Sequence, residues 1–168
     1  TAAALVFPTL FFAEDMPRYV SLFASFSTFA VGFLARPVGG VVFGHFGDRV
    51  GRKAALVTAL MMMGVATTLI GLLPSYEQVG PLAPLLLIFL RFVQGLAVGG
   101  QWGGAMLLVT ENAPSDQRGF YGAFAQVGAP AGLVLANLAF LAVSGNLSDE
   151  AFMDWGWRVP FISSVLLI

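Results

Sequence analysis

Long apolar stretches alternate with short polar segments along the whole chain. Four of these stretches approach the roughly 20 apolar residues that a helix needs to span a bilayer, and they cover residues 19–43, 54–73, 84–110 and 120–143. We interpret two shorter apolar stretches as parts of further spans, residues 1–13 and 159–168. The pattern predicts an all-α membrane protein with six spans, of which the first and the sixth are truncated.

The composition indicates that lipid, rather than water, surrounds this chain. Apolar residues make up 58% of the 168 residues and charged residues only 10%, whereas soluble domains carry about a quarter charged residues. The net charge of −1 provides no basic surface for nucleic acid. Cysteine is absent and His45 is the single histidine, so the several ligands of a zinc site are missing. We therefore expect no metal, no cofactor and no nucleic-acid partner.

The charges of the polar segments predict how the spans are oriented. Segments 44–53 and 111–119 fall on the same side and together hold four lysines and arginines, whereas the segments of the other side hold two. Because lysine and arginine favour the cytoplasm, segment 44–53 is predicted to be cytoplasmic. Trp155 and Trp157 are then expected at the outer boundary between water and lipid, where tryptophan is favoured.

The segment GHFGDRVGRK joins the second and third predicted spans. Residue by residue it is consistent with a positively charged turn on the cytoplasmic side. Its residue order resembles the signature between helices 2 and 3 of the major facilitator superfamily, which is matched at Gly44, Asp48, Arg49, Gly51, Arg52 and Lys53. The resemblance implies a cytoplasmic gate that holds the outward-facing state. It also implies that Arg52 pairs with Glu111 at the end of the fourth span.

The fourth predicted span combines a polar face with a row of glycines. At about 100° per residue, one narrow face holds the polar residues Arg91, Gln94 and Gln101. A ridge beside it holds Gly95, Gly99 and Gly103, and such small residues let a neighbouring helix approach closely. A charge that faces lipid is costly, so Arg91 is expected to face a water-filled cavity or a partner. The alternative is that Arg91 snorkels to the outer interface.

Several further motifs resemble one family of the superfamily. RFVQG is similar to the superfamily's helix 4 motif, whose arginine lies by the central cavity and is associated with proton coupling or anion binding. GGQWGGA, LARPVGGVVFGHFGDRVGRK and WGWRVPF resemble the metabolite:proton symporter family, which includes shikimate, α-ketoglutarate, proline/betaine and citrate carriers. The resemblance covers the whole chain. It implies the N-terminal half of a major facilitator fold, with two three-helix repeats and a missing C-terminal half.

Gln101 departs from the pattern of this family, whose members commonly carry glutamate at the matching position. Glutamine cannot titrate, and the predicted spans contain no aspartate or glutamate. Three alternatives follow for a coupled proton: the missing half carries it, His45 carries it, or transport is uncoupled.

Three more polar residues are candidates for the cavity: Arg36, Gln126 and Asn137. Arg36 precedes Pro37, which removes one helix hydrogen bond, and its alternatives are lining the cavity, internal pairing or snorkelling. For Gln126 and Asn137, interhelical hydrogen bonding is the more common role. Two cations near one cavity would suit an anionic or zwitterionic substrate.

These features predict a secondary active transporter of a bacterial inner membrane, which moves a small organic acid or zwitterion with protons by alternating access. Its partners would be that substrate, protons, the lipid bilayer and the missing half of the chain. The alternatives are an uncoupled facilitator, a drug/proton antiporter of the same superfamily, and a non-transporting structural or sensory subunit. An enzyme is not expected, because the predicted spans lack the histidine or aspartates of an intramembrane protease.

Overall fold

Helices account for nearly all of the computed structural model, which describes residues 6–12 and 17–167. Four of them are long and apolar enough to cross a membrane. In chain order the elements are α2 (Phe7–Leu10), α3 (Arg18–Val50), α4 (Arg52–Gly71), α5 (Tyr76–Val79), α6 (Leu82–Asn112), α7 (Arg118–Asn146), α8 (Asp149–Ala151), a π-helical turn (Phe152–Gly156), α9 (Arg158–Ile162) and a 3-10 turn (Ser163–Leu167). The described residues contain no strand, which agrees with the predicted all-α class.

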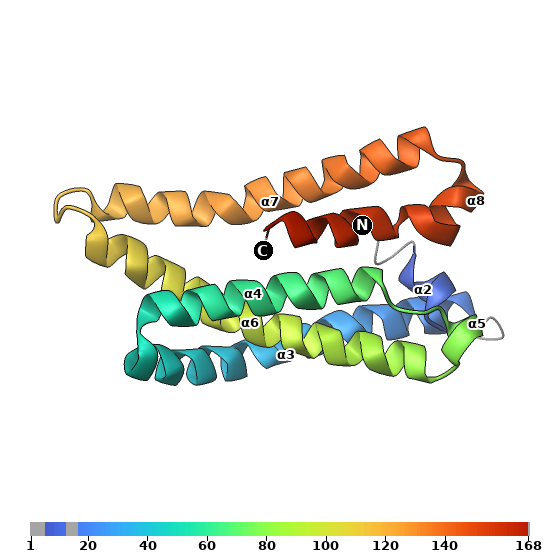
Figure 1. Ribbon diagram of the computed structural model, residues 1–168, viewed down its shortest axis with the longest axis horizontal. Helices are drawn as coiled ribbons and strands as arrows, with labels where there is room; N and C mark the ends of the chain where they lie inside the picture. The colour runs from blue at the N-terminus through green and yellow to red at the C-terminus, as the bar shows by residue number, and fades with distance from the viewer. Residues whose placement is uncertain (1–5, 13–16, 168) are drawn as a thin grey trace.

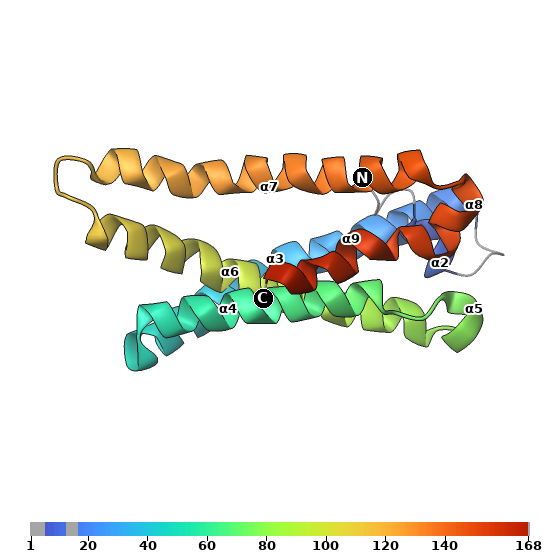
Figure 2. The same ribbon diagram turned by 45° about the horizontal axis from the view of Figure 1, so that its top comes forward.

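The connections between the helices alternate between two ends of the molecule (Figure 1). The α3–α4 turn and the α6–α7 connection lie at one end, whereas α2, α5 and α8 lie at the other. Helix α6 packs extensively against both α3 and α4. Figure 2 shows that α7 stands apart from α3 and α4, so that it contacts the bundle mainly through α6 and the segment around α9.

Helix α3 is longer than the apolar pattern indicates. The predicted span ends at residue 43, but the helix continues to Val50 and the chain reverses at Gly51 alone. Hydropathy marks where lipid ends rather than where a helix ends, and polar residues continue a helix into water at no cost to its backbone hydrogen bonds. Gly51 ends it because its φ of +108° is accessible mainly to glycine.

The first predicted span, residues 1–13, is seen only in part. Within residues 6–12 the chain forms the single helical turn of α2. Residues 1–5 and 13 lie outside the described residues. At the other end of the chain, the predicted partial span 159–168 corresponds to α9 and the 3-10 turn that follows it.

Trp157 lies inside the bundle rather than at the predicted boundary with lipid. Its side chain is 1% exposed, whereas that of Trp155 is 50% exposed. The Trp157 ring makes edge-on contacts with Phe11 and Phe7, with ring centroids 5.8 and 6.4 Å apart. Two residues along a helix correspond to a rotation of about 200°. The two tryptophans therefore point in different directions, and only Trp155 is free to meet the interface.

Glycines bring α3 and α6 close together. A Cβ atom on Gly95 would collide with the carbonyl oxygen of Gly32, and one on Gly99 would collide with the carbonyl oxygen of Arg36. Since these neighbours are backbone atoms, a larger residue would force the helices apart. A Cβ atom on Gly103 would meet no atom within 4 Å, so this last glycine of the predicted ridge does not belong to the contact.

Two further glycines contribute to the same helix pair. Gly39 lies against the backbone of Leu96, and Gly100 lies against the ring of Phe43. Gly39 is on α3, and Gly100 follows Gly99 of the predicted ridge, so the contact between the two helices is wider than one row of glycines. Small residues allow this close packing of membrane helices.

Candidate functional site

An open cleft of about 360 Å³ lies among α3, α4, α6 and α9. Its polar lining residues are Arg36 from α3, Thr67 from α4, and Arg91 and Gln94 from α6. The rest of the lining is mainly apolar and includes Phe29 and Phe161. Two arginines from different helices therefore share one cleft, and this arrangement requires the glycine-mediated contact of α3 with α6.

Arg91 is held on several sides at this cleft. Its Nη1 donates a hydrogen bond to Gln94 Oε1 at 3.0 Å. The guanidinium carbon lies 4.5 Å from the centroid of the Phe29 ring and 5.3 Å from that of Phe7. Such contacts are attractive because the face of an aromatic ring carries negative charge.

The positive charge of Arg91 has no acidic counterpart in the described part of the chain, where no carboxylate lies within ion-pair distance of it. Its Nε is buried and has no hydrogen-bond partner among residues 6–12 and 17–167. Buried charges are normally paired or hydrogen-bonded. Arg91 therefore lines the cleft as a cation without an acidic partner among the described residues.

Helix α4 joins this network through Thr67, a residue that the sequence analysis did not single out. Gln94 Nε2 donates to Thr67 Oγ1 at 2.7 Å, and Thr67 Oγ1 donates to the carbonyl oxygen of Met63 at 2.7 Å. Two adjacent threonines inside an apolar span were the available signal. The sequence offered no way to tell which of them faces α6.

Arg36 lies at the exposed side of the cleft. Its guanidinium carbon lies 4.0 Å from the ring centroid of Phe33 on the same helix. The helix continues through Pro37 without interruption. Arg36 thus lines the cleft and contacts an aromatic ring of its own helix.

The structure places the remaining cavity candidates elsewhere. Gln101 is half-buried on α6 but does not line the cleft. Gln126 is exposed on α7, and Asn137 donates from Nδ2 to the carbonyl oxygen of Leu133 on the same helix at 2.8 Å. Helix α7 stands away from α3 and α4 (Figure 2), and no described residue of α7 is among those that line this cleft. His45 is exposed on α3, far along the helix from Arg36.

An ion pair joins two helices at the end that carries the α3–α4 turn. Nη1 of Arg52, at the start of α4, pairs with Oε1 of Glu111, near the end of α6. The two side chains are 41% and 51% exposed. Exposed pairs contribute only about 0.2–1 kcal/mol to stability. The pair is therefore weak enough to open and close without unfolding either helix.

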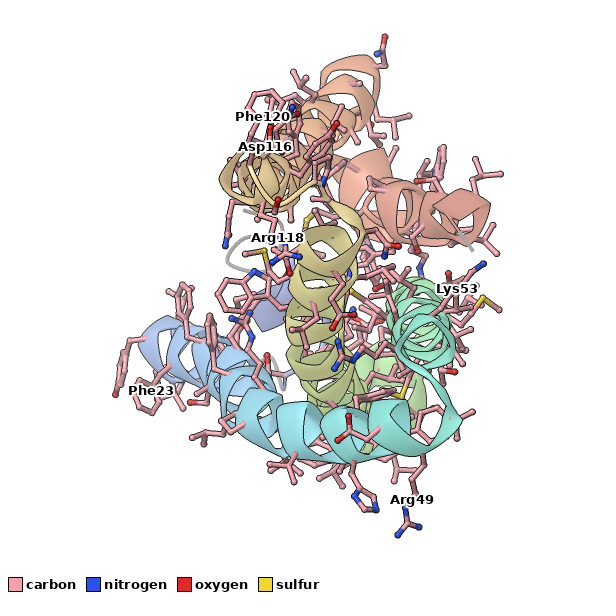
Figure 3. The ribbon with its side chains drawn as sticks, turned by 90° about the vertical axis from the view of Figure 1, so that its left-hand side faces the viewer. Phe23, Arg49, Lys53, Asp116, Arg118 and Phe120 are labelled. Atoms are coloured by element: carbon pink, nitrogen blue, oxygen red, sulfur yellow. The ribbon has the colours of Figure 1, made fainter. Side chains whose placement is uncertain are left out.

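The other charged residues of the GHFGDRVGRK segment are exposed at the same end of the molecule. Asp48, Arg49 and Lys53 are exposed and form no ion pair within the described ranges. Figure 3 shows Arg49 and Lys53 projecting outward from the bundle. A Cβ atom on Gly44 would meet nothing within 4 Å. Among residues 6–12 and 17–167, no group of three or more acidic or histidine side chains could hold a metal ion.

Comparison with known proteins identifies the family. A family model described as "Sugar (and other) transporter" matches residues 2–167. The chain belongs to this transporter family. Its members are transporters, which confirms that the chain is not from an enzyme.

Similar curated proteins come from bacteria. The chain is 58% identical to the "Inner membrane metabolite transport protein YhjE" and 52% identical to the "Shikimate transporter", both of Escherichia coli (strain K12). These alignments cover 100% and 99% of this chain but 38% of each relative. The "Proline/betaine transporter" of the same strain is 40% identical over 88% of the chain. The predicted family resemblance is thus confirmed, and the inner-membrane location agrees with these relatives.

Solved structures share the fold at lower identity. The inward-open xylose transporter XylE from Escherichia coli superposes with a TM-score of 0.83 at 20% identity, covering 98% of this chain and 40% of that one. XylE bound to 6-bromo-6-deoxy-D-glucose gives a TM-score of 0.79 at 17% identity. The predicted major facilitator fold is therefore confirmed. The chain spans 30% to 40% of the length of these matched proteins.

Proposed function

We propose that the full-length protein is a secondary active transporter that moves a small organic acid or zwitterion with protons by alternating access. The observation that carries this proposal is the cleft shared by Arg36 and Arg91, in which Arg91 lacks an acidic partner among the described residues. The present chain would form the N-terminal half of the transporter. The C-terminal half would complete the cavity around the substrate.

The chemistry of Arg91 favours a carboxylate as the group that it binds. Arginine presents five N–H donors in a planar fork that matches a carboxylate. Gln94 occupies one side of that fork through Nη1. The relatives named as shikimate and proline/betaine transporters also support a small metabolite as the substrate.

The proton part of the proposal rests on resemblance to the metabolite:proton symporter family. In the described part of the four long helices, the acidic residues are Asp48 and Glu111, which stand near helix ends. Gln101 cannot replace a titrating carboxylate. A coupled proton would therefore use residues beyond this chain or His45.

Uptake into proteoliposomes that contain the full-length protein tests this function. We expect a radiolabelled organic acid or zwitterion from a metabolite panel to accumulate under an inward proton gradient. A protonophore should abolish the accumulation. Uptake that is unaffected by the protonophore would indicate an uncoupled facilitator. Export of hydrophobic cations would indicate a drug antiporter. If no metabolite crosses the membrane, the structural or sensory alternative replaces the proposal.

The Arg52–Glu111 ion pair is proposed to act as the cytoplasmic gate implied by the GHFGDRVGRK segment. Arg52→Gln and Glu111→Gln should each change the uptake rate by up to about fivefold, the ratio that corresponds to an exposed pair worth up to about 1 kcal/mol. The double variant should match the single variants, because each substitution removes the same interaction.

Arg118→Gln is the matched control for the gate, since Arg118 is exposed, begins α7 at the same end of the molecule, lies outside the gate signature and forms no ion pair in the described structure. Its uptake rate should stay within a factor of about two, as surface substitutions usually have small effects. Fully additive losses in the double variant would show that the two side chains act independently.

A further inference from the structure

We infer that Thr67 is a positioning residue, which orients the guanidinium of Arg91 toward the substrate through the side chain of Gln94. The inference rests on the proposed function, because it assigns Arg91 a direct contact with the substrate. Thr67 belongs to α4 and the other two residues belong to α6. The orientation of Arg91 is therefore set by a neighbouring helix as well as by its own.

The hydrogen bonds between these residues run in one direction only. Arg91 has donors and no acceptor, so the carbonyl oxygen of the Gln94 amide must face it. The amide nitrogen of Gln94 then points at Thr67 Oγ1, at 2.7 Å. The single O–H donor of Thr67 is committed to the Met63 carbonyl oxygen, which leaves Thr67 Oγ1 as an acceptor. The hydrogen bond from Arg91 to Gln94 therefore depends on the one from Gln94 to Thr67, which depends on the one from Thr67 to the Met63 carbonyl oxygen.

This row of hydrogen bonds determines which N–H groups of Arg91 are occupied within the protein. Gln94 engages Nη1 at 3.0 Å, while the rings of Phe29 and Phe7 restrain the guanidinium. The Nε of Arg91 is buried within the protein and makes no hydrogen bond to any described residue. The guanidinium group also carries donors on Nη2. Thr67 thus keeps Gln94 on Nη1 and leaves the donors of Nη2 for a carboxylate.

Replacing Thr67 with valine would preserve the branched shape and remove the acceptor. The amide nitrogen of the half-buried Gln94 would lose its partner inside the bundle, which is unfavourable for a polar group with little access to water. The amide would rotate to find another partner, and Arg91 would lose its fixed acceptor. Thr67→Ser retains the hydroxyl and should restore the arrangement.

Thr68 is a matched control on the same helix. Its hydroxyl donates to the carbonyl oxygen of Gly64 at 3.0 Å and lies 3.1 Å from Ser164 Oγ. Thr68 does not line the cleft. Thr68→Val therefore removes an interhelical hydrogen bond of similar size at the next position, without altering the contacts of Arg91.

The first measurement is the kinetics of uptake by the full-length protein, with the best transported of shikimate, proline, glycine betaine and α-ketoglutarate as the probe. Thr67→Val should raise KM by about three- to tenfold, as expected for a weakened hydrogen bond to a charged group. Vmax should stay within about twofold. Thr67→Ser and Thr68→Val should resemble the unmodified protein. In a Gln94→Leu background, Thr67→Val should add nothing further, whereas a Thr67 that touches substrate directly would add its own loss.

The second measurement needs no transport. Phenylglyoxal labelling followed by peptide mass spectrometry reports the freedom of each arginine, with the exposed Arg49 as the internal reference. Thr67→Val should speed labelling of Arg91 several-fold, and Thr68→Val should leave it unchanged. Unaltered labelling and unaltered KM would overturn the positioning role. If Arg91 labelling responds but no metabolite of the panel is taken up by the unmodified protein, the positioning of Arg91 stands and the proposed function fails.

Discussion

Replacing Arg91 with methionine in the full-length protein should lower kcat/KM for uptake by about ten- to a hundredfold, mainly through KM. A hydrogen bond to a charged group is worth about 1.5–3 kcal/mol, and each 1.4 kcal/mol corresponds to about a factor of ten. Methionine retains much of the apolar length of the side chain but offers no donors. Initial rates of uptake into proteoliposomes, measured over a range of substrate concentrations, provide the test.

Two variants sharpen this result. Arg91→Lys keeps the charge but loses the planar fork, so we expect an intermediate KM. Arg158→Met is the matched control, because Arg158 donates from Nη1 to the Gly71 carbonyl oxygen and lies over the Trp157 ring, outside the cleft. Its KM should remain close to that of the unmodified protein. A folded Arg91→Met variant with unchanged KM would remove Arg91 from the substrate site.

The second large effect is expected from Gly95→Ala, which should lower the unfolding temperature of the detergent-purified protein by several degrees. A Cβ atom at this position would collide with the Gly32 carbonyl oxygen and lie 2.8 Å from Ala35 Cβ. Overpacking of this kind costs about 1–3 kcal/mol. Because α3 and α6 also carry Arg36 and Arg91, the variant should disturb the cleft as well as the fold.

Gly103→Ala is the control for this substitution. Gly103 lies on the same helix, and a Cβ atom there would meet nothing within 4 Å. Alanine is favoured over glycine in helices by up to about 1 kcal/mol, so this variant should unfold at the same or a slightly higher temperature. Equal loss of stability in both variants would mean that helix packing at Gly95 does not limit stability.

Residue spacing predicts contacts between two side chains of the same helix. Arg91 and Gln94 were placed on one face from their separation, and they form a direct hydrogen bond. The partners from other helices, Phe29 and Thr67, could not be selected in this way, since each span offers many side chains of similar type. Gly103 illustrates the same difficulty, because its spacing matches that of Gly95 while the neighbouring helix has already diverged.

Motif resemblance supplied one contact between helices that spacing does not provide. Arg52 and Glu111 are far apart in the sequence, and the order of residues in the GHFGDRVGRK segment implied the ion pair that the structure contains. The same segment was interpreted as a loop from its polarity. In the structure, Gly51 alone makes the turn, because a polar helix can continue into water.

By itself, the sequence determined that four long segments are apolar enough to cross a membrane, and its motifs indicated the transporter family to which the chain belongs. Transfer of a segment into a bilayer depends mainly on its own side chains, and these are written in order along the chain. Only the tertiary structure decided which faces meet, that Trp157 is buried, and that Thr67 supports Arg91. Those outcomes depend on the distances between the backbones of different helices. These distances are short where glycines lie in the contact and larger elsewhere.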